Sequence, residues 1–333
     1  MNISAIVPLW NGRELLERLL DTLDAQTQPA AELLAVDNGS TDGAPELARR
    51  RGARVIPMGY NAGFACAVNR GITESRGEWI AVLNSDVELA SDYFEALAET
   101  GAWFATGRIL KHGAAARGEP PKIDATFDAV CRGGTSWRVG SGRTDGPAFA
   151  SARTIWSAPW TAALFRAELF QRVGLLEESF ESYLEDVDFG LRCARLSLPG
   201  QYVPGAVAWH RGSASLGRWH PETVRRIARN QLLLAARHYP NACLARWTWP
   251  ILVAQSLWGG VALRHGAGWA WIRGVLEGVR NFSTVRRKST LFASEPLRRV
   301  LAENERSIRQ LQSDTKFDFY WRLYFLLAGG GAK

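Results

Sequence analysis

The sequence predicts an α/β fold: a mostly parallel sheet with helices on both faces, followed by a basic helical extension. Three observations support this. Short apolar runs alternate with amphipathic stretches over the first hundred residues, polar clusters follow the ends of those runs, and composition changes beyond residue 240. Alternation of strands and helices is typical of parallel sheets, whose ligands gather at the carboxyl ends of the strands.

The first expected strand is the apolar run at residues 4–9, which ends at Asn11-Gly12. Leucines then recur at helical spacing over residues 15–23, which indicates an amphipathic helix. The same strand–helix unit repeats, with further strands at 33–36, 54–57 and 79–83, and helices at 44–51 and 64–75. Such repetition predicts a mostly parallel sheet with helices on both faces.

The middle of the chain is less regular. Residues 112–156 are rich in Gly and lack clear periodicity, so we expect a partly irregular lobe with short strands. Further helices are expected at 166–173, 180–196 and 221–238, with a short strand near Tyr202. These elements complete a main domain of residues 1–240, and residues 241–333 form a separate tail.

The tail is basic and rich in tryptophan. Residues 225–333 carry 18 Lys and Arg against 6 Asp and Glu, whereas the whole chain has a net charge of +7. Basic surfaces bind nucleic acid or anionic lipid. Indole rings beside arginines are typical of bilayer interfaces, so we expect an anionic membrane surface and no nucleic acid. The tail tryptophans are Trp247, Trp249, Trp258, Trp269, Trp271 and Trp321.

Residues 247–263 contain no charge, but this stretch is shorter than the roughly 20 residues of a membrane span. It also contains Pro250 and Gly259-Gly260. We expect an interfacial or re-entrant helix pair here, and the alternative is a buried helix packed on the main domain. The N-terminus lacks a secretory signal and the four cysteines show no paired spacing, so we expect a cytoplasmic protein at the inner face of the membrane.

Two polar clusters follow expected strands. Asp37 and Asn38 follow the second strand, and Asn84-Ser85-Asp86 follow the strand at 79–83. A carboxylate such as Asp37 can accept the N3 proton of a uracil or thymine ring, although such a residue is often only a turn former or helix cap. Asp86 can bind a divalent cation that balances a diphosphate, or it can cap a helix starting near Ser91.

Two further features complete the candidate site. Glu185, Asp186 and Asp188 stand ahead of an apolar helical pattern, where the helix dipole favours acids. Three acids exceed what capping requires, and one of them can remove a proton from an attacking hydroxyl. His210 follows a strand-like stretch, and an isolated histidine is usually structural or solvated. With a cation implied by Asp86, its neutral imidazole is a candidate second protein ligand.

Together these motifs resemble glycosyltransferase family 2, especially its bacterial rhamnosyltransferase-like branch. The resemblance covers roughly residues 1–240. It rests on IVPLWNG at 6–12, VDNGSTDG at 36–43, NAGFA at 61–65, LNSD at 83–86, YLEDVDFGLR at 183–192 and WH at 209–210.

The resemblance implies a Rossmann-like GT-A fold, with a nucleotide-binding half at 1–110 and an acceptor and catalytic half at 111–240. It implies Mg²⁺ or Mn²⁺ bound by Asp86 and His210, and Asp186 of the Glu185-Asp186 pair as general base. The implied nucleotide-sugar set is Pro8, Trp10, Asp37, Asn38, Asn61, Gly63, Asn69, Asn84, Ser85 and Asp86. Asn84 departs from the usual acid, which leaves one formal anion in the triplet.

The function that follows is an inverting, metal-dependent glycosyltransferase. It would move a sugar from dTDP-rhamnose or a UDP-sugar to a saccharide or lipid-linked saccharide in cell-envelope polysaccharide synthesis. The alternative is a non-catalytic, membrane-docked subunit that binds a nucleotide or glycan. A dinucleotide-dependent oxidoreductase would need a GxGxxG turn after the first strand, and residues 9–13 do not form one.

Overall fold

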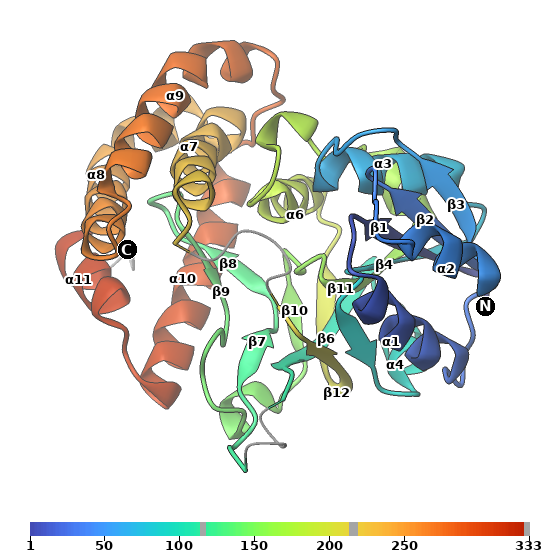
Figure 1. Cartoon of the computed structure of the whole chain (residues 1–333). Helices are drawn as coiled ribbons and strands as arrows, with labels where there is room; N and C mark the ends of the chain where they lie inside the picture. The colour runs from blue at the N-terminus through green and yellow to red at the C-terminus, as the bar shows by residue number, and fades with distance from the viewer. Residues whose placement is uncertain (114–117, 213–218, 330–333) are drawn as a thin grey trace. The chain divides into compact units, whose positions relative to one another are not determined.

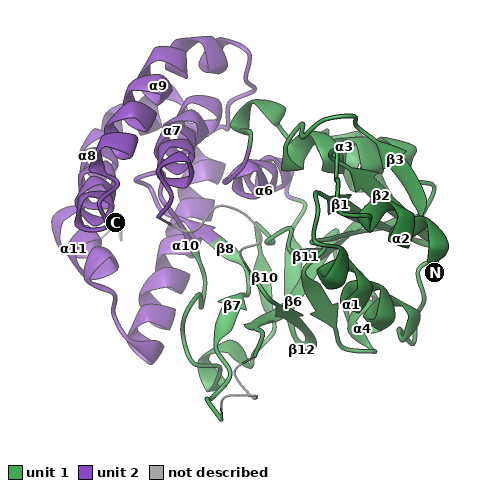
Figure 2. Ribbon diagram, viewed as in Figure 1, with its two compact units in different colours: residues 1–128, 138–181, 198–214 green, residues 129–137, 182–197, 215–333 purple. Residues whose placement is uncertain are grey.

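The structure is a computed structural model that describes residues 1–113, 118–212 and 219–329 (Figure 1). The chain forms two compact units (Figure 2). Unit 1 comprises residues 1–128, 138–181 and 198–214, and unit 2 comprises residues 129–137, 182–197 and 215–333. The chain therefore passes between the units several times, whereas the sequence suggests one boundary near residue 240.

Unit 1 is built on a mixed, mostly parallel sheet. Its path runs β10-β12-β6-β11-β4-β1-β2-β3, with β5 paired to β12 and β7 paired to β6. The strands are β1 (Ile3–Leu9), β2 (Glu32–Asp37), β3 (Arg54–Pro57), β4 (Trp79–Leu83), β5 (Val87–Leu89), β6 (Phe104–Lys111), β7 (Ile123–Ala125), β10 (Arg153–Ile155), β11 (Ala162–Arg166) and β12 (Gly200–His210).

The parallel part of the sheet agrees with the sequence. β1 lies between β2 and β4 and is parallel to both, and β3 extends the order beyond β2. β11 is antiparallel to β4 and β6, whereas β12 is again parallel to β6. The irregular lobe contains short strands as expected, apart from residues 114–117, which lie outside the described residues. Two of its strands, β8 (Asp128–Val130) and β9 (Ser136–Arg138), form a separate small sheet.

Helices cover both faces of the sheet. Alternate residues of β1, Ile3 to Leu9, pack in one apolar core with the leucines of α1. The face between them receives α3, where Gly71 lies so close to β1 that a Cβ would meet Ile6 at 2.4 Å. This alternation explains why the strand is apolar throughout. The helices of unit 1 are α1 (Arg13–Asp24), α2 (Ala44–Arg50), α3 (Phe64–Glu74), α4 (Tyr93–Ala98) and α5 (Ala167–Val173).

Unit 2 is mainly helical. Its helices are α6 (Glu185–Arg195), α7 (Pro221–His238), α8 (Asn241–Arg264), α9 (Gly268–Arg287), α10 (Ser294–Thr315) and α11 (Phe319–Leu327). α7 and α9 cross closely because α9 has glycines at the contact: a Cβ on Gly274 would meet the Arg225 carbonyl oxygen at 2.2 Å. α7 thus packs against the C-terminal helices and belongs to the same unit as they do.

Two expectations about helices are wrong. The helix expected over 180–196 begins only at Glu185, because Tyr183 and Leu184 adopt left-handed backbone angles. Residues 247–263 form no helix pair: they lie within α8, which continues through Pro250 and uses Gly259 to accommodate the Trp271 ring at 2.7 Å from its would-be Cβ. No helix in the described ranges combines the length and apolar character needed to cross a bilayer.

Candidate functional site

Asp37 lies at the carboxyl end of β2, level with Leu9 at the end of β1. The two loops that follow these strands are joined by hydrogen bonds: the Asn11 backbone N–H donates to Ser40 Oγ at 2.8 Å, and Asn11 Oδ1 accepts from the Thr41 N–H at 2.9 Å. Asp37 Oδ1 accepts from the Ser40 N–H at 2.9 Å. Asp37 is thus a turn former through one carboxylate oxygen, and the rigid loop fixes the direction of its side chain.

Four other residues of the expected nucleotide-sugar set lie in β1 or in the loops that follow the strands. Asn38 is buried, and its side chain contacts the backbone at both Ala62 and Gly63. Asn61 accepts from the Gly63 N–H at 3.1 Å. Trp10 is 52% exposed, so its ring is accessible beside the strand ends. Pro8 belongs to β1 itself.

Asn69 has a different environment from the one that the sequence suggests. It is buried on α3, where its amide donates to the Leu176 carbonyl and to Glu178 Oε1, both at 2.9 Å. Its oxygen accepts from the Leu176 N–H at 2.8 Å. These bonds use its polar atoms within the protein, so Asn69 fixes the loop at residues 176–178.

Asp86 and His210 are brought together by strand pairing. β5 begins directly after Asp86 and pairs with the end of β12, so that His210 lies opposite Val87. His210 Nε2 lies 3.1 Å from Asp86 Oδ1. Asp86 caps no helix, because β5 follows it and α4 begins only at Tyr93. The capping interpretation of Asp86 is therefore wrong, and its role as a metal ligand stays a prediction.

A second acid, Asp124, completes this cluster as its third member, and the sequence alone did not reveal it. It lies on β7, and its Oδ2 is 2.8 Å from His210 Nδ1. Its stretch carries no recognisable motif; only the pairing of β7 to β6, and of β6 to β12, brings it beside His210. An imidazole whose Nδ1 is held by a carboxylate presents its Nε2 in a fixed direction, here toward Asp86.

The two carboxylates control the protonation of His210. Burial alone would lower the pKa of His210, but the hydrogen bonds to Asp124 and Asp86 raise it to about 9. Burial likewise opposes ionisation of Asp124, yet His210 and nearby cations lower the pKa of that carboxyl group. His210 is therefore protonated at neutral pH in this arrangement, and it must lose the Nε2 proton before that nitrogen can bind a cation.

The Asp86–His210 pair fits a small divalent cation. Neighbouring ligands of an octahedral Mg²⁺ or Mn²⁺ lie about 3.0 Å apart when the bonds are about 2.1 Å long. The observed separation of 3.1 Å between Nε2 and Oδ1 is close to this edge. Within the described ranges no three His, Cys, Asp or Glu side chains form a metal-binding group, so the remaining ligands would be diphosphate oxygens and water.

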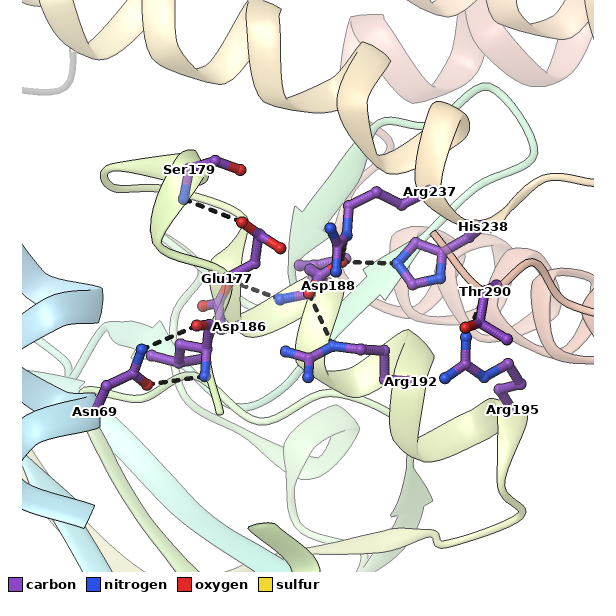
Figure 3. Close-up of polar contacts among 12 residues, drawn as sticks. Asn69, Glu177, Ser179, Asp186, Asp188, Arg192, Arg195, Arg237, His238 and Thr290 are labelled. Carbon is purple, nitrogen blue, oxygen red and sulfur yellow. Dashed lines mark hydrogen bonds and ion pairs between the residues drawn. The ribbon is translucent and has the colours of Figure 1, made fainter. Parts of the chain in front are cut away.

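The second candidate element, the acidic start of α6, belongs to unit 2. Asp186 is 7% exposed, and its Oδ1 accepts from the Val187 N–H at 2.8 Å. Glu185 is similarly buried. Asp188 is fully buried and is bonded to Arg192, Arg237 and His238 (Figure 3). Burial would raise the pKa of Asp188, but these partners hold it well below its usual range.

The sequence matches a known family. The sequence profile described as glycosyl transferase family 2 matches residues 4–174, about half of the chain. The chain belongs to this family. The match begins at β1, includes Asp37 and Asp86, and ends after α5.

A named relative supports the assignment. The N-acetylglucosaminyl-diphospho-decaprenol L-rhamnosyltransferase of Mycobacterium tuberculosis is 30% identical over 278 residues, which cover 75% of this chain and 87% of that protein. EpsJ of Bacillus subtilis, an uncharacterised glycosyltransferase, is 28% identical over 58% of this chain and 56% of its own. This protein is therefore a rhamnosyltransferase-like family 2 glycosyltransferase, which disfavours a purely binding role.

Solved structures show that the fold is GT-A. GalNAc-T7, determined with UDP, GalNAc and Mn²⁺, superposes with a TM-score of 0.64 at 12% identity, covering 92% of this chain and 58% of that one. The mannosyltransferase PcManGT of Pyrobaculum calidifontis, bound to GDP-Man and Mn²⁺, gives a TM-score of 0.50 at 17% identity, covering 98% and 86%. Mn²⁺ thus accompanies the nucleotide in both of these GT-A structures.

Proposed function

We propose that this family 2 enzyme is an inverting, metal-dependent transferase whose acceptor is a hydroxyl of a lipid-linked saccharide. The main support is the Asp86–His210 pair beside the strand ends, because its 3.1 Å separation suits a cation that binds a diphosphate. The mycobacterial relative supports the acceptor class, since its name describes rhamnosyl transfer to a diphospho-decaprenol saccharide. The donor would be dTDP-rhamnose or a UDP-sugar.

In this mechanism the side chains have separate tasks. Asp37 accepts a hydrogen bond from the N3–H of the uracil or thymine ring. Asp86 and His210 would hold Mg²⁺ or Mn²⁺, which supplies charge stabilisation for the departing diphosphate. Asp124 fixes the His210 ring. Asp186 takes the proton of the acceptor hydroxyl while that oxygen attacks the anomeric carbon from the side opposite the leaving group. A single displacement of this kind inverts the anomeric configuration.

The metal proposal can be tested by thermal unfolding with a panel of nucleotide sugars, with and without Mn²⁺. A donor at 100 times its Kd should add about 2.7 kcal/mol to the unfolding free energy. This gain should need Mn²⁺ in the natural protein. Asp86→Asn should abolish the Mn²⁺-dependent part, whereas Asp92→Asn, at an exposed acid on the same unit, should keep it. Retention of the full Mn²⁺ effect in Asp86→Asn would refute the ligand assignment.

We further propose that unit 2 docks on an anionic membrane surface through α9, at the inner face of the cell membrane. Four apolar side chains of α9 recur at helical spacing and are exposed: Trp269 71%, Ile272 38%, Leu276 48% and Val279 60%. Arg273, Arg280, Arg287 and Lys288 are exposed along the same helix and its end. The acid of α9, Glu277, pairs with Arg225 of α7. An amphipathic helix with arginines and a tryptophan is suited to the headgroup region.

Sedimentation with lipid vesicles tests this docking. The protein should bind phosphatidylglycerol vesicles more strongly than phosphatidylcholine vesicles, and high salt should weaken the binding. The double variant Trp269→Gln/Leu276→Gln should lose most of it. A matched control, Tyr60→Gln/Leu196→Gln, changes two exposed apolar residues outside α9 and should bind normally. Equal loss in both double variants would exclude α9 as the contact surface.

A further inference from the structure

The turn that leads into α6 has an unfavourable backbone. Tyr183 and Leu184 have φ angles of 72° and 70°, in the left-handed region that residues with a Cβ rarely adopt. The Leu184 carbonyl accepts the first helical hydrogen bond of α6, from the Asp188 N–H at 2.9 Å. The direction in which α6 starts, and hence the position of Asp186, depends on this turn. Two consecutive strained residues persist only when their surroundings hold them.

The side chain that holds the turn is Asn230, in the middle of α7. It is fully buried, and its amide nitrogen donates to the Ser182 carbonyl at 3.1 Å and to the Tyr183 carbonyl at 2.7 Å. A second contact from α7 fixes the ring: the hydroxyl groups of Tyr183 and Thr223 are 3.2 Å apart. α7 therefore restrains both the backbone and a side chain of the strained turn.

The end of α7 holds the helix itself. Asp188 accepts from Arg237 Nε at 2.7 Å and lies 2.9 Å from His238 Nε2 (Figure 3). Residues two apart on an α-helix differ in direction by about 200°. Fixing Asp188 against α7 therefore turns Asp186 toward the opposite side of α6. The strained turn and the buried acid together determine the orientation of the first helical turn.

We propose that Asn230 and Asp188 are positioning residues that hold Asp186 in its reactive orientation. This proposal rests on the assignment of Asp186 as the general base. A merely structural role would require a stable α6–α7 contact, but it would not require left-handed angles at two non-glycine residues. The left-handed angles of Tyr183 and Leu184 are explained if the turn must hold the Asp186 carboxylate in one direction.

The proposal is tested with Asn230→Ala, measured as kcat and KM per folded molecule. We expect kcat to fall about 10-fold or more, because small misplacements of a reacting group are costly, while the donor KM and Kd stay unchanged. Adding Leu184→Gly should restore kcat about threefold or more, since glycine adopts the left-handed region without strain. Asn304→Ala removes another buried amide of unit 2, which bonds the Val130 carbonyl, and should leave kcat unchanged.

Thr223→Val is nearly isosteric and removes only the hydroxyl partner of Tyr183, so it gives a second measurement if Asn230→Ala folds poorly. It should lower kcat by a smaller factor at constant donor KM. Normal kcat in Asn230→Ala or Thr223→Val, or no rescue by Leu184→Gly, would overturn the positioning role. Asp186→Asn is assayed in parallel: an inactive Asp186→Asn beside a normal Asn230→Ala contradicts only the positioning role, whereas an active Asp186→Asn contradicts the base assignment and this proposal with it.

Discussion

Replacing Asp186 by Asn should lower kcat by about 10²–10⁴-fold, the usual contribution of general-base assistance. The amide has nearly the same shape but cannot take a proton from the acceptor hydroxyl. Donor binding should not change, because Asp186 contributes neither to base recognition nor to the proposed cation site. Steady-state kinetics with a saturating donor, together with calorimetric measurement of donor affinity, would separate the two effects.

The matched control is Asp314→Asn, which makes the same chemical change at an exposed position of α10 in the same unit. Its kcat should equal that of the natural protein. If the Asp186 variant turned over at a comparable rate, another group would have to act as the base, and Glu185 would be the next candidate.

Replacing Glu305 by Ala should destabilise unit 2 by about 3–5 kcal/mol, the usual result of leaving a buried charge without its partner. Glu305 is 4% exposed on α10. Its Oε1 accepts from the Arg132 backbone N–H and from Arg132 Nε, both at 3.0 Å, and from the Tyr324 hydroxyl at 2.9 Å. The variant loses all three bonds and leaves the largely buried Arg132 guanidinium without its carboxylate. Urea unfolding followed by circular dichroism would measure the change.

The same helix supplies the comparison. Glu295 is an exposed acid whose carboxylate lies 3.9 Å from Arg298, and exposed pairs of this kind contribute little. Glu295→Ala should therefore shift the unfolding midpoint only slightly. Similar shifts for both variants would mean that the network around Glu305 stabilises unit 2 no more than a surface ion pair does.

The strands and helices of the first hundred residues were predictable because their apolar periodicity directly reflects burial on two faces of one sheet. Asp86 and His210 could be proposed as ligands of one cation from their residue types and from the family resemblance, and strand pairing explains their proximity. Asp124 could not be found in this way. Asp124 lies beside His210 because β7 pairs with β6 and β6 pairs with β12, and no local sequence pattern encodes these pairings.

Two segments later in the chain, residues 180–196 and 247–263, could not be predicted correctly from local sequence patterns. An apolar pattern over 180–196 predicts a helix, but it does not reveal that Tyr183 and Leu184 adopt left-handed angles, because those angles depend on contacts from α7. Pro250 and Gly259-Gly260 suggested a break in residues 247–263. The helix continues through these residues, and Gly259 lies against a tryptophan ring of α9, a contact between segments that a local preference does not encode.

The several crossings of the chain between the two units have a practical consequence for protein production. Residues 129–137 and 182–197 are encoded well before the last helices, yet they complete their packing only when those helices have been synthesised. A product ending at residue 240 would contain Arg132 and Gly133 without Glu305 and Tyr324, their hydrogen-bond partners. The C-terminal helices therefore cannot be removed without loss of packing within unit 2. A shortened catalytic fragment would expose surfaces that the complete chain buries.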